Sequence, residues 1–96
     1  MHVCAVEFDL RIPLSHSLKD KRAVVKTIIE GARRRYQVAA AEVAHQDNWQ
    51  RAALGMAAVS STPAHVTEVL DEVERFVWSF PEVEVLAADR SWVAES

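Results

Sequence analysis

Residues 4–12 read CAVEFDLRI, and their alternation of apolar and charged side chains decides how the rest of the chain is interpreted. Successive side chains of a strand point to opposite faces of a sheet, so a period of two indicates a strand with one buried face. The pattern predicts a half-buried strand that ends near Pro13. Its inward residues are expected to be Cys4, Val6, Phe8, Leu10 and Ile12, with Glu7, Asp9 and Arg11 pointing outward.

Two helices are predicted after this strand. The first begins after Ser17, an N-cap residue with Asp20 three residues later, and runs to about Arg35. The second begins after Thr62, which precedes a proline at the first helical position, and Pro81 closes it. Apolar residues recur at helical spacing in both, at Leu18, Val25, Ile28, Ile29, Ala32 and Tyr36 and then at Val66, Val69, Leu70, Val73, Phe76, Val77 and Phe80.

Three further strands complete the pattern. Residues 37–45 and 50–61 are expected to be strands joined as a hairpin by the polar segment 45–50, and residues 83–87 alternate as a last strand. The order is strand, helix, strand, strand, helix, strand. It predicts one α+β domain over residues 1–96 with the ferredoxin-like βαββαβ arrangement, in which two helices cover one face of a four-stranded antiparallel sheet.

The two ends of the chain carry opposite charge, although the net charge is only −3. Eight Lys and Arg stand against two acids between Arg11 and Arg35, whereas eight acids stand against two Arg between Thr62 and Ser96. We therefore expect one basic and one acidic region on the surface.

Cysteine usage and the N-terminal sequence indicate the compartment. Cys4 is the one cysteine, so an internal disulfide is impossible and a reducing compartment is expected. Glu7 and Asp9 interrupt the apolar run that a signal peptide needs. We expect a cytoplasmic protein that does not enter the membrane.

The sequence lacks the residues on which known activities of ferredoxin-like proteins depend. Cys4 has no partner for a metal-binding Cys-x-x-Cys pair, and two glycines are too few for the anion loop of an acylphosphatase. RNA-recognition motifs stack bases on aromatic residues of the open sheet face. That face is instead expected to carry small and acidic residues, and no catalytic residues, metal site, cofactor or small-molecule substrate is predicted. The expected outward residues are Val3, Ala5, Glu7, Asp9, Ala53, Gly55 and Ala57.

Cations gather on one side of the first predicted helix. Four of them share one flank at steps of three, four and seven residues, and at about 1.5 Å per residue they extend over roughly 21 Å. We call them the basic ridge: Lys19, Arg22, Lys26 and Arg33. Lys21 is expected to join the ridge at the helix start, where free N–H groups attract anions, so the five residues are candidates for RNA binding. The alternative is an ordinary solvated face.

The predicted hairpin holds the second set of candidate residues, which are Glu42, His45, Gln46, Asp47, Trp49, Gln50 and Arg51. His45 and Asp47 are too few for a metal site, and a capped turn is favoured. Trp49 would either stack on a base or a partner, or bury itself against the sheet edge. Two arrangements stay open: the ridge and the hairpin on one surface, or two sites at opposite ends of the sheet.

Three stretches resemble the YlxP-like family of small bacterial proteins, a family of unknown function. They are HSLKDKRAVVK at 16–26, AEVAHQDNWQRA at 41–52 and GMAAVSS at 55–61. Ala44 and Cys4 depart from the family pattern, where an acid and a glycine are expected. The resemblance implies a ferredoxin-like fold and, from genes that neighbour those of translation factors, a role in ribosome assembly or translation. It implies no catalytic residues.

Three functional hypotheses follow. The first is a non-enzymatic accessory protein that binds structured RNA, ribosomal RNA or a ribosomal subunit through the ridge, aided by the hairpin. The second is a protein-interaction module that forms a homodimer through the open sheet face or through Trp78, which is expected to be either partly exposed or covered by the last strand. The third, an enzyme that uses Glu42, His45 and Asp47, lacks a nucleophile and a complete metal set.

Overall fold

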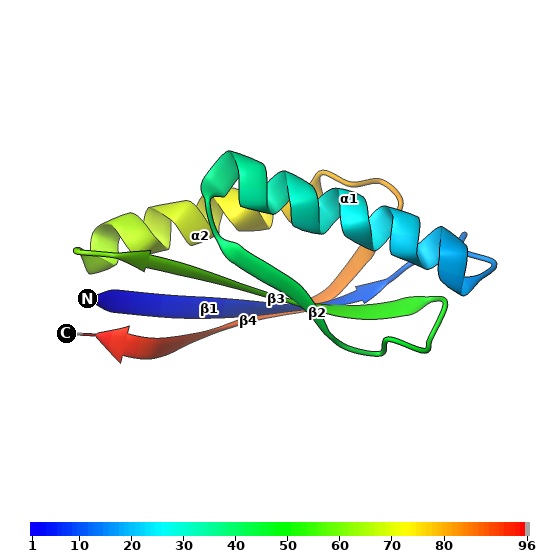
Figure 1. The fold of residues 1–96 in the computed structure, drawn as a ribbon, viewed down its shortest axis with the longest axis horizontal. Coiled ribbons are helices and arrows are strands. Elements are labelled where there is room, and N and C mark those ends of the chain that lie inside the picture. Colours follow the sequence, from blue (N-terminus) through cyan, green and yellow to red (C-terminus); the bar gives the residue numbers. More distant parts are fainter. Residues whose placement is uncertain (96) are drawn as a thin grey trace.

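The computed structural model describes residues 1–95, which form two layers, a sheet and a pair of helices on one of its faces (Figure 1). All the strand pairs are antiparallel, and the strand order is β2-β3-β1-β4. The prediction of an α+β ferredoxin-like fold is confirmed. The elements are β1 (His2–Arg11), α1 (Leu18–Tyr36), β2 (Ala39–Ala44), β3 (Arg51–Ser60), α2 (Pro63–Trp78) and β4 (Glu84–Glu95).

The core lies between the sheet and the helices, and β1 is its central strand. Phe8 and Leu10 are fully buried, as their alternation with charged residues predicts. Burying one such side chain stabilises the fold by about 1.5–3 kcal/mol. Ile28 and Ala32 on α1 and Leu70 on α2 close the core from the other side.

Both helices begin at the predicted caps. Ser17 Oγ accepts a hydrogen bond from the backbone N–H of Asp20 at 3.0 Å, and the Asp20 carboxylate accepts one from the backbone N–H of His16 at 3.1 Å. Thr62 Oγ1 accepts one from the backbone N–H of His65 at 3.2 Å. Because these bonds satisfy N–H groups that the helix itself leaves free, they fix where each helix starts.

The largest difference between the predicted and the observed strands is the length of the last strand, β4. The last strand continues to Glu95 instead of stopping at residue 87, because β4 stays paired with β1 across two irregularities in register. These irregularities shift the alternation of side chains, so the sequence pattern alone breaks off early. Ala53 lies opposite Asp9 in the register of β3 with β1, which places it on the open face as expected, but it is only 2% exposed. No helix within residues 1–95 is both long and apolar enough to cross a membrane.

Candidate functional site

Lys21 lies inside the protein, so the prediction that it binds RNA was wrong. Its side chain is fully buried, and its ammonium donates hydrogen bonds to Glu42 Oε2 at 2.8 Å and to the carbonyls of His45 at 2.9 Å and Gln46 at 3.1 Å. The helical repeat explains the error, because Lys21 precedes buried Val25 by four residues and lies on the apolar side of α1. All three N–H donors of the ammonium are satisfied within the protein.

Lys21 joins the start of α1 to the hairpin between β2 and β3. Gln50 adds a second connection, since its Nε2 donates to the carbonyls of Pro13 at 3.3 Å and Ser15 at 3.2 Å. A backbone bond of 2.8 Å from Ile12 N–H to the Gln50 carbonyl makes a third. Of the two arrangements that the sequence left open, the structure therefore shows one unit: the start of α1 and the hairpin tip lie at the same end of the sheet (Figure 1).

Residues 45–50 form the loop of this hairpin, and its first five residues, 45–49, are exposed. His45 adopts a left-handed backbone with φ 63°, and its carbonyl accepts a turn bond of 3.0 Å from the N–H of Asn48. The Asn48 side chain in turn accepts a bond of 2.9 Å from the N–H of Gln50. A capped turn is thus what the polar sequence encodes here. Within residues 1–95 no group of three or more His, Cys, Asp or Glu could hold a metal ion.

Arg51 is the first residue of β3, directly after the hairpin loop, and it forms an ion pair within the protein. Its Nη2 donates to both carboxylate oxygens of Asp9, at 2.7 and 2.9 Å, on the face of the sheet opposite the helices. Both side chains are about one-third exposed, at 35% and 36%. This pair fixes β3 to β1 and leaves Arg51 less available to a partner than the other hairpin residues.

The basic ridge is on the surface as predicted, without Lys21. Lys19, Arg22, Lys26 and Arg33 are all exposed. Among the residues that the structure describes, Lys19 and Arg22 form no ion pair, and the pair of Lys26 with Glu30 is long, at 4.0 Å. An exposed pair of that length contributes little to stability. Lys19 and Arg22 therefore remain free to meet an external anion, and the weak pair of Lys26 leaves that ammonium accessible as well.

Three ridge residues also line a shallow groove between α1 and β2, an edge strand of the sheet. Arg22, Lys26 and Arg33 lie on the helix side of the groove and Ala41 and Glu42 on the strand side. Arg33 Nη2 donates to the carbonyl of Ala40 at 2.6 Å, which holds the far end of the ridge against β2. The groove therefore places three cations beside the carboxylates of Glu30 and Glu42 along one edge of the molecule.

The acidic residues gather at the other edge, around α2 and β4. Arg90 of β4 donates to Asp71 at 2.7 Å and to Glu74 at 2.9 Å. Burial disfavours the charged form of Arg90, but these hydrogen bonds outweigh it and raise its pKa above the ordinary value. Glu72 likewise raises the pKa of exposed Arg75 through a hydrogen bond. Since β2 and β4 are opposite edges of the sheet, the basic and acidic regions lie apart.

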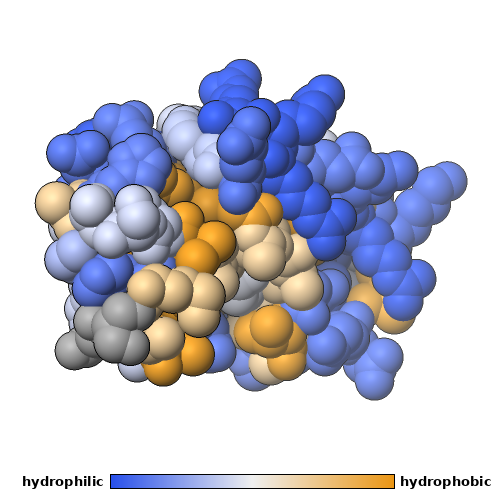
Figure 2. All heavy atoms as spheres, turned by 60° about the vertical axis from the view of Figure 1, so that its left-hand side comes forward, coloured by the Kyte–Doolittle hydropathy of each residue, from blue (hydrophilic) through white to orange (hydrophobic). Residues whose placement is uncertain are grey.

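The open face of the sheet carries mainly small apolar residues. Figure 2, which turns the end with both termini forward, shows apolar side chains in one area bordered by hydrophilic ones. Val43 and Val59 are 48% and 63% exposed, and Gly55 and Ala57 lie between them in the register of β3 with β2 and β1. As the sequence indicates, the described part of this face offers no aromatic platform for RNA bases.

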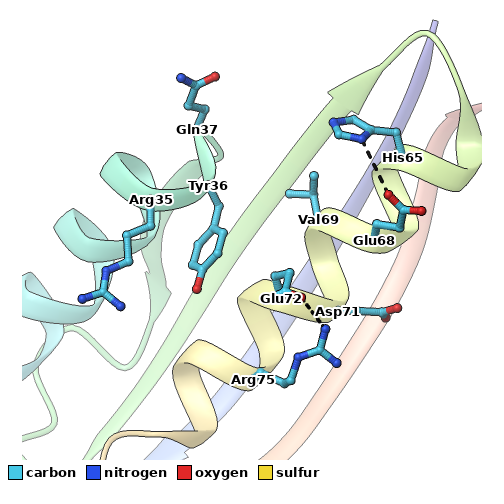
Figure 3. Close-up of a pocket in the computed structure, with 9 residues that line it drawn as sticks. All are labelled: Arg35, Tyr36, Gln37, His65, Glu68, Val69, Asp71, Glu72 and Arg75. Atoms are coloured by element: carbon cyan, nitrogen blue, oxygen red, sulfur yellow. Dashed lines mark hydrogen bonds and ion pairs between the residues drawn. The ribbon is translucent and has the colours of Figure 1, made fainter.

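A hollow between the end of α1 and α2 was not anticipated from the sequence. Figure 3 shows Tyr36 between the two helices, with Arg75 paired to Glu72 across from it. The hollow encloses about 490 Å³. Its charged groups largely pair with one another, and Arg35 stacks over the ring of Phe76 at 5.1 Å. Because the residues that line the hollow come from two helices far apart in the sequence, no sequence motif predicts the hollow.

Comparison with known proteins agrees with the fold and the motifs. A family model described as "Protein of unknown function (DUF503)" matches residues 3–90. The uncharacterized protein YlxP of Bacillus subtilis (strain 168) is 41% identical over 76 residues, which cover 79% of this chain and 83% of that protein. The solution NMR structure of the de novo designed protein LFR1 1 with ferredoxin fold matches 99% of this chain and 88% of its own, with a TM-score of 0.56 and 14% identity, and so shows the fold alone. The chain therefore belongs to the DUF503 family, with YlxP among its relatives.

Proposed function

We propose that the protein is a non-enzymatic accessory protein that binds structured RNA, alone or within a ribosomal subunit, through the basic ridge. One observation carries the proposal: Lys19, Arg22, Lys26 and Arg33 remain exposed along one side of a single helix. They extend over roughly 21 Å, which is enough to meet several successive phosphates. Ribosome maturation or translation, in the cytoplasm, is the setting that the resemblance to the YlxP-like family suggests.

The hydrogen bonds that the hairpin residues form within the protein support a non-enzymatic role. Glu42, the first candidate base, is bound to the Lys21 ammonium, and the His45 carbonyl is bound to the same group. A general base has to reach a substrate proton directly or through one water. The Glu42 side chain is only 17% exposed and forms an ion pair with Lys21, which we call the Lys21 clamp. Glu42 is therefore poorly placed for proton transfer.

Sedimentation with purified ribosomal subunits tests the proposal. The native protein is expected to move with one of the two subunits. Combined replacement of Lys19, Arg22 and Lys26 by glutamine should abolish this co-sedimentation, because it removes three phosphate contacts. The matched control replaces Arg11, Arg34 and Arg75 by glutamine, which changes the net charge equally outside the groove and should co-sediment like the native protein. Equal behaviour of the two variants would contradict a role of the ridge.

A homodimer joined through the open sheet face is the second candidate function. The observation that favours it is the exposure of Val43 and Val59 on this face, because exposed apolar patches often mark contact surfaces. Sedimentation equilibrium is expected to show a mass that rises with concentration, and Ala57→Glu should hold the chain at the monomer mass of 10.8 kDa. A native protein that stays monomeric at all concentrations excludes this function.

A further inference from the structure

The structure assigns Trp49 as a stacking surface for an unpaired base of the RNA whose phosphates lie along the basic ridge. This inference rests on the proposed function and names the feature of the RNA that is recognised. Trp49 belongs to the loop 45–50, and 47% of its surface is exposed. Every base has a π-face, so an exposed indole accepts a base without regard to sequence.

The position of Trp49 is fixed from both sides. Before it, the Lys21 ammonium binds the carbonyls of His45 and Gln46. After it, the Gln50 side chain binds the carbonyls of Pro13 and Ser15. A loop anchored at both ends loses little conformational freedom on binding, and this makes an exposed aromatic side chain on it more effective as a contact.

Burying the Lys21 ammonium is energetically costly, and this indicates that the ion pair serves to hold the loop that carries Trp49. A buried ammonium and carboxylate rarely stabilise a fold more than apolar residues of the same size would. Here the ion pair places the hairpin loop against the start of α1, where Lys19 and Arg22 are exposed. The loop that carries Trp49 and the start of α1 that carries Lys19 and Arg22 thereby lie at the same end of the molecule (Figure 1).

The arrangement fits an RNA with a helical stem and unpaired nucleotides beside it. A paired stem offers a regular series of phosphates to the ridge, but its bases are already stacked and are inaccessible to Trp49. Bases in loops and bulges are free to leave the stack. The expected ligand is therefore a stem with a loop or bulge, rather than a continuous duplex.

Binding of two RNAs to three tryptophan variants tests the inference. The probes are a short RNA hairpin with an unpaired loop and a fully paired duplex with the same number of phosphates. Trp49→Ala is expected to weaken binding of the hairpin about tenfold and to leave the duplex unchanged. Trp49→Phe keeps a ring and should restore most of the loss. Trp78→Ala, which removes an exposed tryptophan of α2, is the matched control and should change neither affinity.

The outcomes separate this inference from the proposed function. If the native protein binds both RNAs and Trp49→Ala has no effect, or weakens both equally, stacking by Trp49 is refuted while RNA binding by the ridge stands. If the native protein binds neither RNA and no ribosomal subunit, the proposed function fails and the inference fails with it. If only intact ribosomal subunits bind, the proposed function stands, and equal binding of the native protein and Trp49→Ala to the subunits refutes stacking by Trp49.

Discussion

Replacement of Lys21 by methionine is expected to lower the free energy of unfolding by about 3 kcal/mol or more. The methionine fills most of the space but leaves the partly buried Glu42 carboxylate and the Gln46 carbonyl without their donor. The His45 carbonyl keeps only its turn bond from the Asn48 N–H. Removing one partner of a buried pair is costly because the other remains charged and poorly solvated. Since small domains are stable by only about 5–15 kcal/mol, the effect is a large share of the total.

Urea unfolding followed by circular dichroism measures this loss. Lys26→Met, an exposed position on the same helix, is the control and should change the free energy of unfolding by less than about 0.5 kcal/mol. The double variant Lys21→Met with Glu42→Leu should recover part of the loss, because an apolar pair needs no donor. A single variant as stable as the native protein would show that the clamp is not energetically important.

The second large effect is the salt dependence of binding to duplex RNA. Each phosphate neutralised contributes about 0.9 to the slope of log affinity against log salt concentration, so contacts by four ridge cations give a slope of about −3 to −4. Affinity should therefore fall roughly a hundredfold when the salt concentration rises fourfold. Four cations are assigned to the ridge because Lys21 is buried and contributes nothing.

Fluorescence anisotropy of a labelled duplex over a series of salt concentrations gives this slope. The variant with glutamine at positions 19, 22 and 26 should have a slope smaller in magnitude by about three. The variant with glutamine at positions 11, 34 and 75 should keep the native slope. A native slope near zero would exclude phosphate recognition, and equal slopes in both variants would place the contact elsewhere on the protein.

The fold was predictable because each element shows its own local signal. Alternation defines β1, Ser17 and Thr62 cap the helices, and the 3-4 spacing of apolar residues gives their buried faces. The end of β4 was missed because its pairing with β1 crosses irregularities that only the neighbouring strand determines. The end of β4 is thus determined by its pairing with β1 and not by its local sequence pattern.

The candidate site was predictable in part, and Lys21 shows why. A lysine among exposed cations is ordinarily at the surface, so sequence reasoning placed it with the ridge. Its position four residues before buried Val25 was the signal that it faces inward. The partner, Glu42, lies 21 residues away on a strand of alanines, and no short-range pattern connects the two. The joining of hairpin and helix start follows from that contact, so the structure was needed to show it.

The ridge and the hairpin loop are expected to form one RNA-facing surface. Titration of the isotopically labelled protein with the hairpin RNA, followed by NMR of the backbone amides, tests it most directly. The amides that shift are expected to lie in residues 17–33 of α1 and its cap and in residues 45–51, while those of α2 and the open sheet face stay unchanged. Shifts centred on Ala5, Gly55 and Ala57 of the open face, with α1 and the loop unaffected, would contradict it.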